Sequence, residues 1–156
     1  MRSWLRQSAL RTCILLMSVL SVGCSDSDVF APEVIEETEF AASLGINLSS
    51  MTKTASGLYI EEIQLGEGEE ASAGDLATVT YTGMLSNATT FDTGTFSFTL
   101  GSGGVIQGFD EGVTGMRVGG IRRVVIPPEL AYGNTGSGSI PPGSILIFRI
   151  QLDALN

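Results

Sequence analysis

One stretch of the sequence, residues 105–133, constrains the fold more than the rest of the chain. It reads VIQGFDEGVTGMRVGGIRRVVIPPELAYG. Apolar side chains recur in its first part at spacings of three and four residues, which predicts one face of a short helix. A glycine pair follows, and a run rich in β-branched residues at 121–126 then predicts a strand. The stretch therefore predicts a short helix that turns back against a sheet.

The predicted helix carries a single apolar stripe. Its members are Ile106, Phe109, Val113 and Met116. Asp110 stands near the start of the helix, where the helix dipole favours a negative charge. Both features support a short amphipathic helix at this place.

Further strands are predicted on both sides of this stretch by alternating or β-branched residues. They lie at 75–84 (DLATVTYTGM), 95–100 (TFSFTL) and 145–152 (ILIFRIQL). In the last of these every second residue, beginning at Leu146, is apolar and shares one face. Several strands around one helix predict an α+β domain, in which a mostly antiparallel β-sheet wraps one short α-helix.

Composition limits the chemistry that the chain can perform. Its 156 residues suit one domain with extensions, and 8 basic against 17 acidic residues give a formal charge of -9. This charge argues against a nucleic-acid partner, because phosphate binding needs a basic face. The pair Arg122 and Arg123 is interpreted as including a solvated strand position. The chain has no histidine, which removes His-dependent nucleophilic catalysis and most zinc sites, so we expect neither a metal nor a cofactor.

Residues 1–23 are predicted to be a signal peptide. Three arginines precede an apolar core at 13–22, which is too short for a comfortable membrane span. The segment ends on Gly23 and Cys24 and resembles the lipobox of bacterial lipoproteins, although the favoured leucine lies one position early, at Leu20. An ordinary cleaved signal that leaves Cys24 as a free thiol, or an uncleaved anchor, is the alternative.

The lipobox resemblance implies that Cys24 is lipidated and anchors the protein to a membrane of the bacterial cell envelope. Ser25 stands where an aspartate often marks retention in the inner membrane, which favours the outer membrane. Residues 24–51 are then an acidic tether, extended by repulsion between its carboxylates. A short helix at 36–44, with Phe40 and Leu44 on one side, is an alternative to a solvated linker.

Six segments occur in an order and spacing that resemble the FK506-binding-protein (FKBP) family of peptidyl-prolyl isomerases. They are VTYTGML, FD, FSFTLG, VIQGFDEGVTGM, PPELAYG and IPPGSILIF. The resemblance covers about residues 52–154 and implies an FKBP-like domain at 52–156. Taken one by one, each aromatic residue in these segments also fits a place in the core.

The resemblance implies a binding pocket and assigns residues to it. Its lining would comprise Tyr81, Phe91, Asp92, Phe96, Val105, Ile106, Phe109, Tyr132 and Phe148. Phe109 would form the floor, while the Tyr132 hydroxyl and the Ile106 backbone N–H would donate hydrogen bonds to the substrate. Ile140 would line the rim that faces proline.

The implied activity is rotation about X-Pro bonds in envelope polypeptides, with FK506-type macrolides as inhibitors. This reaction needs no nucleophile, metal or proton transfer, which suits a chain without histidine. The alternative is a binding module or chaperone of the same fold with weak or no isomerase activity. The segment after Asp92 keeps it open, because it is short and lacks the arginine that often pairs with this aspartate. Two further departures from the family are Phe109, which replaces the tryptophan of well-known members, and the small, glycine-rich loop at 134–140.

Overall fold

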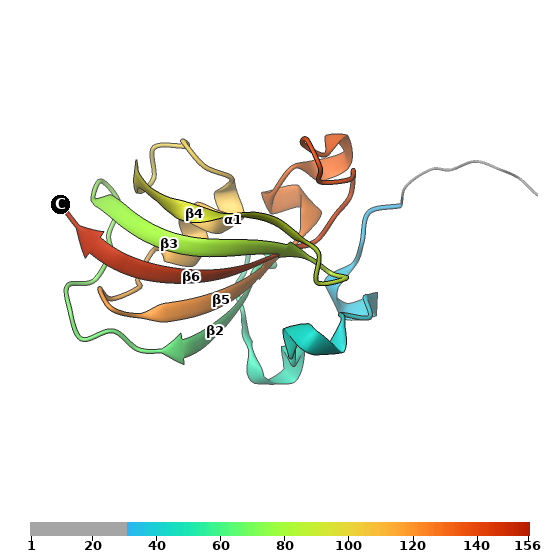
Figure 1. Ribbon diagram of the computed structural model, residues 1–156, viewed down its shortest axis with the longest axis horizontal. Coiled ribbons are helices and arrows are strands. Elements are labelled where there is room, and N and C mark those ends of the chain that lie inside the picture. The colour runs from blue at the N-terminus through green and yellow to red at the C-terminus, as the bar shows by residue number, and fades with distance from the viewer. Residues whose placement is uncertain (1–30) are drawn as a thin grey trace, which may run out of the picture.

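The computed structural model describes residues 31–156, so the predicted signal peptide and Cys24 lie outside the described residues. No helix within residues 31–156 is long and apolar enough to cross a membrane. The chain forms a six-stranded sheet in the order β1-β2-β5-β6-β3-β4, with every neighbouring pair antiparallel (Figure 1). The strands are β1 (Thr52–Lys53), β2 (Tyr59–Gln64), β3 (Leu76–Leu85), β4 (Thr90–Thr99), β5 (Ile121–Ile126) and β6 (Leu146–Leu155).

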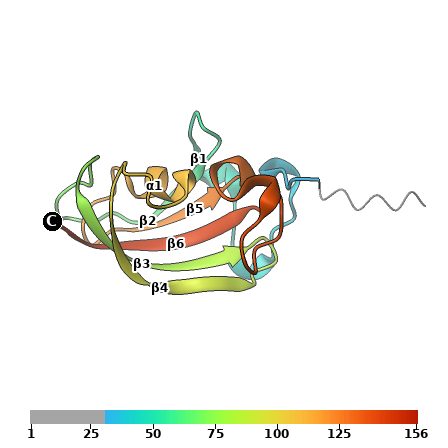
Figure 2. The same ribbon diagram turned by 90° about the horizontal axis from the view of Figure 1, so that it is seen from above.

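The predicted α+β architecture is confirmed. The predicted strand at 121–126 is β5 to the residue, whereas β4 begins five residues earlier than predicted and includes the FD segment. The one α-helix of the described residues, α1 (Gln107–Val113), lies against one face of the sheet (Figure 2). The predicted stripe residues Phe109, Val113 and Met116 are all buried on this side.

Two glycines let α1 approach the sheet closely. A Cβ added at Gly108 would stand 2.3 Å from Cγ2 of Ile126, and one added at Gly112 would stand 3.0 Å from Cγ1 of Val124. Both partners belong to β5. The helix backbone therefore packs directly on this strand, and any side chain at Gly108 would push the helix away.

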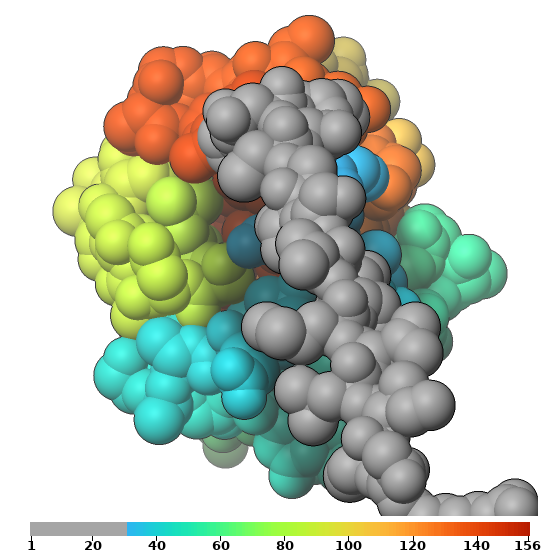
Figure 3. All heavy atoms as spheres, turned by 90° about the vertical axis from the view of Figure 1, so that its right-hand side faces the viewer, coloured from blue at the N-terminus to red at the C-terminus, as the bar shows by residue number. Residues whose placement is uncertain are grey.

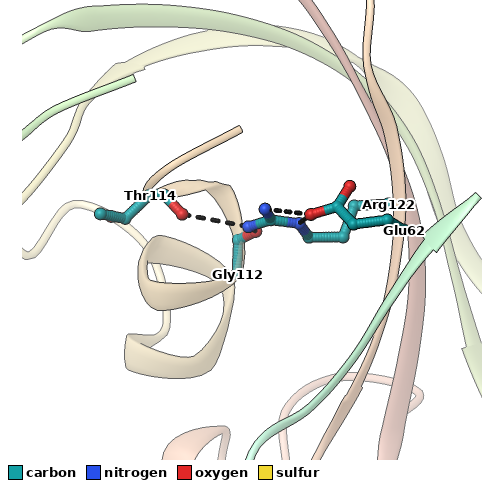
Figure 4. A network of polar contacts seen from close by, with 4 residues as sticks. All are labelled: Glu62, Gly112, Thr114 and Arg122. Atoms are coloured by element: carbon teal, nitrogen blue, oxygen red, sulfur yellow. Dashed lines mark hydrogen bonds and ion pairs between the residues drawn. The ribbon is translucent and has the colours of Figure 1, made fainter. Parts of the chain in front are cut away.

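A buried arginine closes the end of α1. The Arg122 residue, on β5, is only 8% exposed, and its Nη1 donates hydrogen bonds to the carbonyl oxygens of Gly112 (2.9 Å) and Thr114 (3.0 Å) (Figure 4). Its Nε donates to the Glu62 carboxylate at 2.6 Å. The guanidinium thus satisfies carbonyl groups that a helix end leaves without partners, where the helix dipole also favours a cation.

The solvated position predicted for the arginine pair is not found. Arg122 points into the core, because successive residues of a strand face opposite sides of the sheet. Arg123 lies on the other face, where its side chain is 22% exposed and donates to Glu61 at 2.9 Å and to the Gly45 carbonyl at 3.3 Å. Both arginines bind groups of the protein itself.

Residues 33–51 pack on the face of the sheet opposite α1. They form three 3₁₀ turns, Ile35–Glu37, Ala42–Leu44 and Leu48–Ser50, rather than a continuous helix at 36–44. Ile35 and Leu44 are 4% and 7% exposed and join a second core cluster with Tyr59, Val125 and Ile147. Residues 33–51 therefore belong to the folded domain, although the predicted domain boundary lies at residue 52.

We expect Arg122→Met to lower the free energy of unfolding by about 2 to 3 kcal/mol, because one buried and one partly buried carbonyl group lose their donor. Urea denaturation measures the loss. Arg123→Met is the matched control. It removes a more exposed ion pair, so we expect about 1 kcal/mol or less. Equal losses in the two variants would contradict a capping role for Arg122.

Candidate functional site

A pocket of about 200 Å³ opens between α1, β4 and the loop before β6. It is lined by Tyr81, Phe91, Asp92, Phe96, Gly104, Val105, Ile106, Phe109, Tyr132 and Phe148. The structure therefore brings together every predicted pocket residue except Ile140, and adds Gly104. Pockets for drug-sized ligands usually enclose roughly 300 to 1,000 Å³, so this one suits a single small ring with its flanking backbone.

Phe109 forms the floor of the pocket. It is 3% exposed and projects from the middle of α1, between the two glycines that hold this helix on the sheet. Its ring packs against those of Tyr81, Phe96, Phe98 and Phe148, with centroid separations of 5.1–5.8 Å. Rings from β3, β4 and β6 thus fix its orientation, in the edge-to-face or tilted geometries that aromatic pairs prefer.

A β-bulge explains how neighbouring residues Phe91 and Asp92 both reach the pocket. In regular pairing, successive side chains of a strand point to opposite faces. Here Asp92 pairs with Gly83 and Thr90 pairs with Met84, so Phe91 is an extra residue in β4. A bulge of this kind redirects a side chain, and it places both members of the FD segment in the pocket wall. From Asp92 to Thr99 the pairing of β4 with β3 is then unbroken.

Asp92 has a partner on the adjacent strand. The Tyr81 hydroxyl donates a hydrogen bond to Oδ2 of Asp92 at 2.5 Å, and the Thr93 N–H donates to Oδ1 at 2.9 Å. Burial, followed by the hydrogen bond to Asp92 and the charge of this carboxylate, raises the pKa of Tyr81 to about 12. The segment after Asp92 has no arginine to pair with this aspartate. The Tyr81 hydroxyl instead donates the hydrogen bond that holds the Asp92 carboxylate.

Gly83 is a site residue that the sequence analysis missed. A Cβ at this position would stand 2.6 Å from Cζ of Phe91 and 2.8 Å from Cε1 of Phe148. The two rings, whose centroids are 5.5 Å apart, pack edge to face across the glycine. The Tyr-Thr-Gly sequence of β3 was the available signal, because a glycine inside a strand often marks the close approach of another group.

The two predicted hydrogen-bond donors of the pocket come from two separate segments of the chain. Ile106 is the residue before α1, with extended backbone angles of φ -61° and ψ 145°. Its N–H precedes the helix, so no carbonyl of the helix accepts it. Tyr132 follows the short 3₁₀ turn Pro128–Leu130 and is 37% exposed, which leaves its phenol at the mouth of the pocket.

The predicted position of Ile140 at the pocket rim is wrong. Ile140 does not line the pocket and is 8% exposed in the main core cluster. Its carbonyl and N–H both bond to Ser137, at 3.0 Å and 2.8 Å, so the loop folds tightly on itself. This local closure turns the side chain inward. Within residues 31–156 no group of three or more His, Cys, Asp or Glu residues is arranged to hold a metal ion.

We expect Tyr81 to ionise near pH 12, well above the ordinary tyrosine pKa of about 10. Because the folded state favours the neutral phenol, Tyr81 contributes its full stabilisation below about pH 10 and loses it as the pH rises toward 12. Absorbance titration near 295 nm measures this pKa, and Tyr81→Phe identifies the signal. Asp92→Asn should bring the pKa part of the way down, since burial remains; an unchanged value would contradict the hydrogen bond.

The sequence is similar to known families and proteins. Residues 67–153 match the family model of the FKBP-type peptidyl-prolyl cis-trans isomerases. An FK506-binding protein of Neisseria meningitidis serogroup B is 48% identical over 102 residues, which cover 62% of this chain and 94% of that protein. FKBP15-3 of Arabidopsis thaliana, a peptidyl-prolyl cis-trans isomerase, is 40% identical over 75% of this chain and 87% of its own length. FK506-binding protein 4 of Mycosarcoma maydis is 49% identical over 65% of this chain, but the match spans only 28% of that longer protein.

Solved structures agree with these matches. FkpA of Escherichia coli superimposes with a TM-score of 0.65 and 33% identity, covering 74% of this chain and 55% of FkpA. A peptidyl-prolyl cis-trans isomerase of Pseudomonas syringae gives a TM-score of 0.63 and 33% identity, covering 69% of this chain and 81% of that one. With its sheet, single helix and aromatic pocket, the chain belongs to the family of FKBP-type peptidyl-prolyl cis-trans isomerases.

Proposed function

We propose that the protein accelerates rotation about X-Pro bonds by enclosing the prolyl ring in the aromatic pocket while two donors hold the adjacent carbonyl. The observation that carries this proposal is the floor and wall of packed rings, which surround a volume suited to one small ring. The similarity to an FK506-binding protein of Neisseria meningitidis supports FK506-type macrolides as competing ligands.

The chemistry follows from the peptide bond itself. Rotation about an amide sacrifices resonance and has a barrier of about 18 to 20 kcal/mol. The planar amide is strongly polarised and the twisted amide is less so. An apolar pocket therefore disfavours the planar ground state more than the twisted transition state, which is the differential stabilisation that catalysis requires. A thousandfold acceleration needs only about 4 kcal/mol of such difference.

Each polar group then has a positioning role. The Ile106 N–H and the Tyr132 hydroxyl donate hydrogen bonds to substrate carbonyl groups while the ring lies over Phe109. Asp92 accepts a hydrogen bond from the Tyr81 hydroxyl at 2.5 Å. This bond fixes the orientation of the Tyr81 ring against Phe109. In this mechanism Asp92 is a wall acceptor rather than a general base, because bond rotation transfers no proton.

We further propose that the substrates are polypeptides of the bacterial cell envelope and that a lipid on Cys24 anchors the protein, with the outer membrane as its location. The signal layout of residues 1–23 supports this location. Incorporation of a labelled fatty acid into the wild-type protein but not into Cys24→Ala tests the anchor. Equal labelling of both would contradict it.

The test of the catalytic proposal is a prolyl-peptide isomerisation assay on the chain without its predicted signal peptide. We expect turnover that an FK506-type macrolide inhibits. Gly83→Ala should lower kcat/KM by about tenfold, because the new methyl group displaces the Phe91 and Phe148 rings at a cost of about 1 to 3 kcal/mol.

Gly94→Ala is the matched control in the same pair of strands. A Cβ at Gly94 would meet only Tyr81 atoms, at 3.8 and 3.9 Å, which is ordinary contact. We expect its kcat/KM to equal that of the wild type. Macrolide binding without turnover in the wild type would instead select a binding module, and the absence of both would refute the pocket assignment.

A further inference from the structure

Glu33 joins two loops that are far apart in the sequence. Its backbone N–H donates to the Gly143 carbonyl at 2.8 Å. Its carboxylate accepts the Ile145 N–H at 2.8 Å through one oxygen and the Ser86 hydroxyl at 2.8 Å through the other. Ser86 lies in the turn between β3 and β4, whereas Gly143 and Ile145 lie in the loop before β6. One residue near the start of the described chain therefore holds both loops.

Pro32 reinforces this contact by close packing. A Cβ added at Gly143 would stand 2.8 Å from the Cα of Pro32, and Gly143 has a φ of +70°. Only glycine meets both requirements at this position without strain. We call Pro32 and Glu33 the brace. Figure 3 faces this end of the molecule, with the yellow-green region of the β3–β4 turn and the orange region of the loop before β6 both turned toward the viewer.

The brace connects to both walls of the pocket. On one side the Gly143 N–H donates to the Gly133 carbonyl at 2.8 Å, and Gly133 directly follows Tyr132. On the other side the Ser86 turn leads into the first residues of β4, where the bulge aims Phe91 into the pocket. The two arms of the Glu33 carboxylate thus hold Ser86, five residues before Phe91, and Ile145, two residues after the Gly143 that bonds to Gly133.

The brace is itself held in place by buried residues. Ile35, two positions after Glu33, is 4% exposed and belongs to the cluster that contains Val125, Ile145 and Ile147. This cluster covers the face of the sheet opposite α1. The brace therefore has a fixed base, although it lies outside residues 67–153, which match the family model.

From these contacts we infer that Glu33 is a positioning residue of the isomerase site, which sets the separation between the Tyr132 and Phe91 walls. The inference rests on the proposed function of the pocket. Glu33 touches neither substrate nor reacting atoms in this role. It acts through the loop before β6 and through the β3–β4 turn, so its removal should widen the site without removing any group that lines it.

The experiment compares Glu33→Ala, Glu33→Gln and the wild type in the full mature chain. Alanine removes both arms, and we expect KM and the macrolide Kd to rise by about fivefold, the effect of losing about one net hydrogen bond, with kcat nearly unchanged. Glutamine should restore wild-type values, because its amide oxygen accepts the Ile145 N–H and its amide nitrogen donates to the Ser86 hydroxyl. If Glu33→Ala only lowered the fraction of folded protein, the apparent kcat per total protein would fall and KM would stay unchanged.

Glu37→Ala is the matched control, since Glu37 is an exposed carboxylate of the same segment and should give wild-type constants. Should Glu33→Ala fail to fold, Ser86→Ala removes one arm only and should raise KM by a smaller factor. Wild-type KM in Glu33→Ala, or an equal rise in Glu33→Gln, would overturn the brace. Absence of turnover in the wild-type chain would overturn the proposed function instead.

Discussion

The direct contact between α1 and β5 is the constraint on which the rest of the structure depends. Gly108 and Gly112 bring the helix backbone against Ile126 and Val124, and no larger residue fits at Gly108. Arg122 on β5 then caps the C-terminal end of the helix. The depth and rotation of a two-turn helix are thereby fixed, although so short a helix has little stability of its own.

The position of this helix decides the chemistry of the site. Phe109 lies between the two glycines, so the groups that bring the helix to the sheet also set the height of the pocket floor. Rings from β3, β4 and β6 close around it. The same element supplies the N–H of Ile106 at its start. A pocket walled by packed aromatic rings, with a few placed polar groups, suits a reaction in which the charge distribution of an amide changes and no covalent bond breaks.

Local patterns in the sequence were sufficient for β3, β5, β6, part of β4 and the helix stripe, whereas the resemblance to the FKBP family supplied most of the pocket. The alternation that begins at Leu146 and the spacing around Phe109 each depend on one element, which is why they could be predicted. Features that depend on two distant elements could not. Arg122 is buried only because α1 ends against β5 at this residue. Glu33 makes its contacts only because the β3–β4 turn and the loop before β6 come together beside it. Ile140 was misplaced because its loop closes on itself.

The bulge at Phe91 also bears on how pockets of this kind diverge. The wall depends on one unpaired residue in a strand of otherwise regular alternation. Deleting a single residue there would leave both strands able to pair and would turn one aromatic ring toward the opposite face. A related protein could thus lose its prolyl-binding wall and keep its core through a change in the length of this hairpin, without any change of residue type.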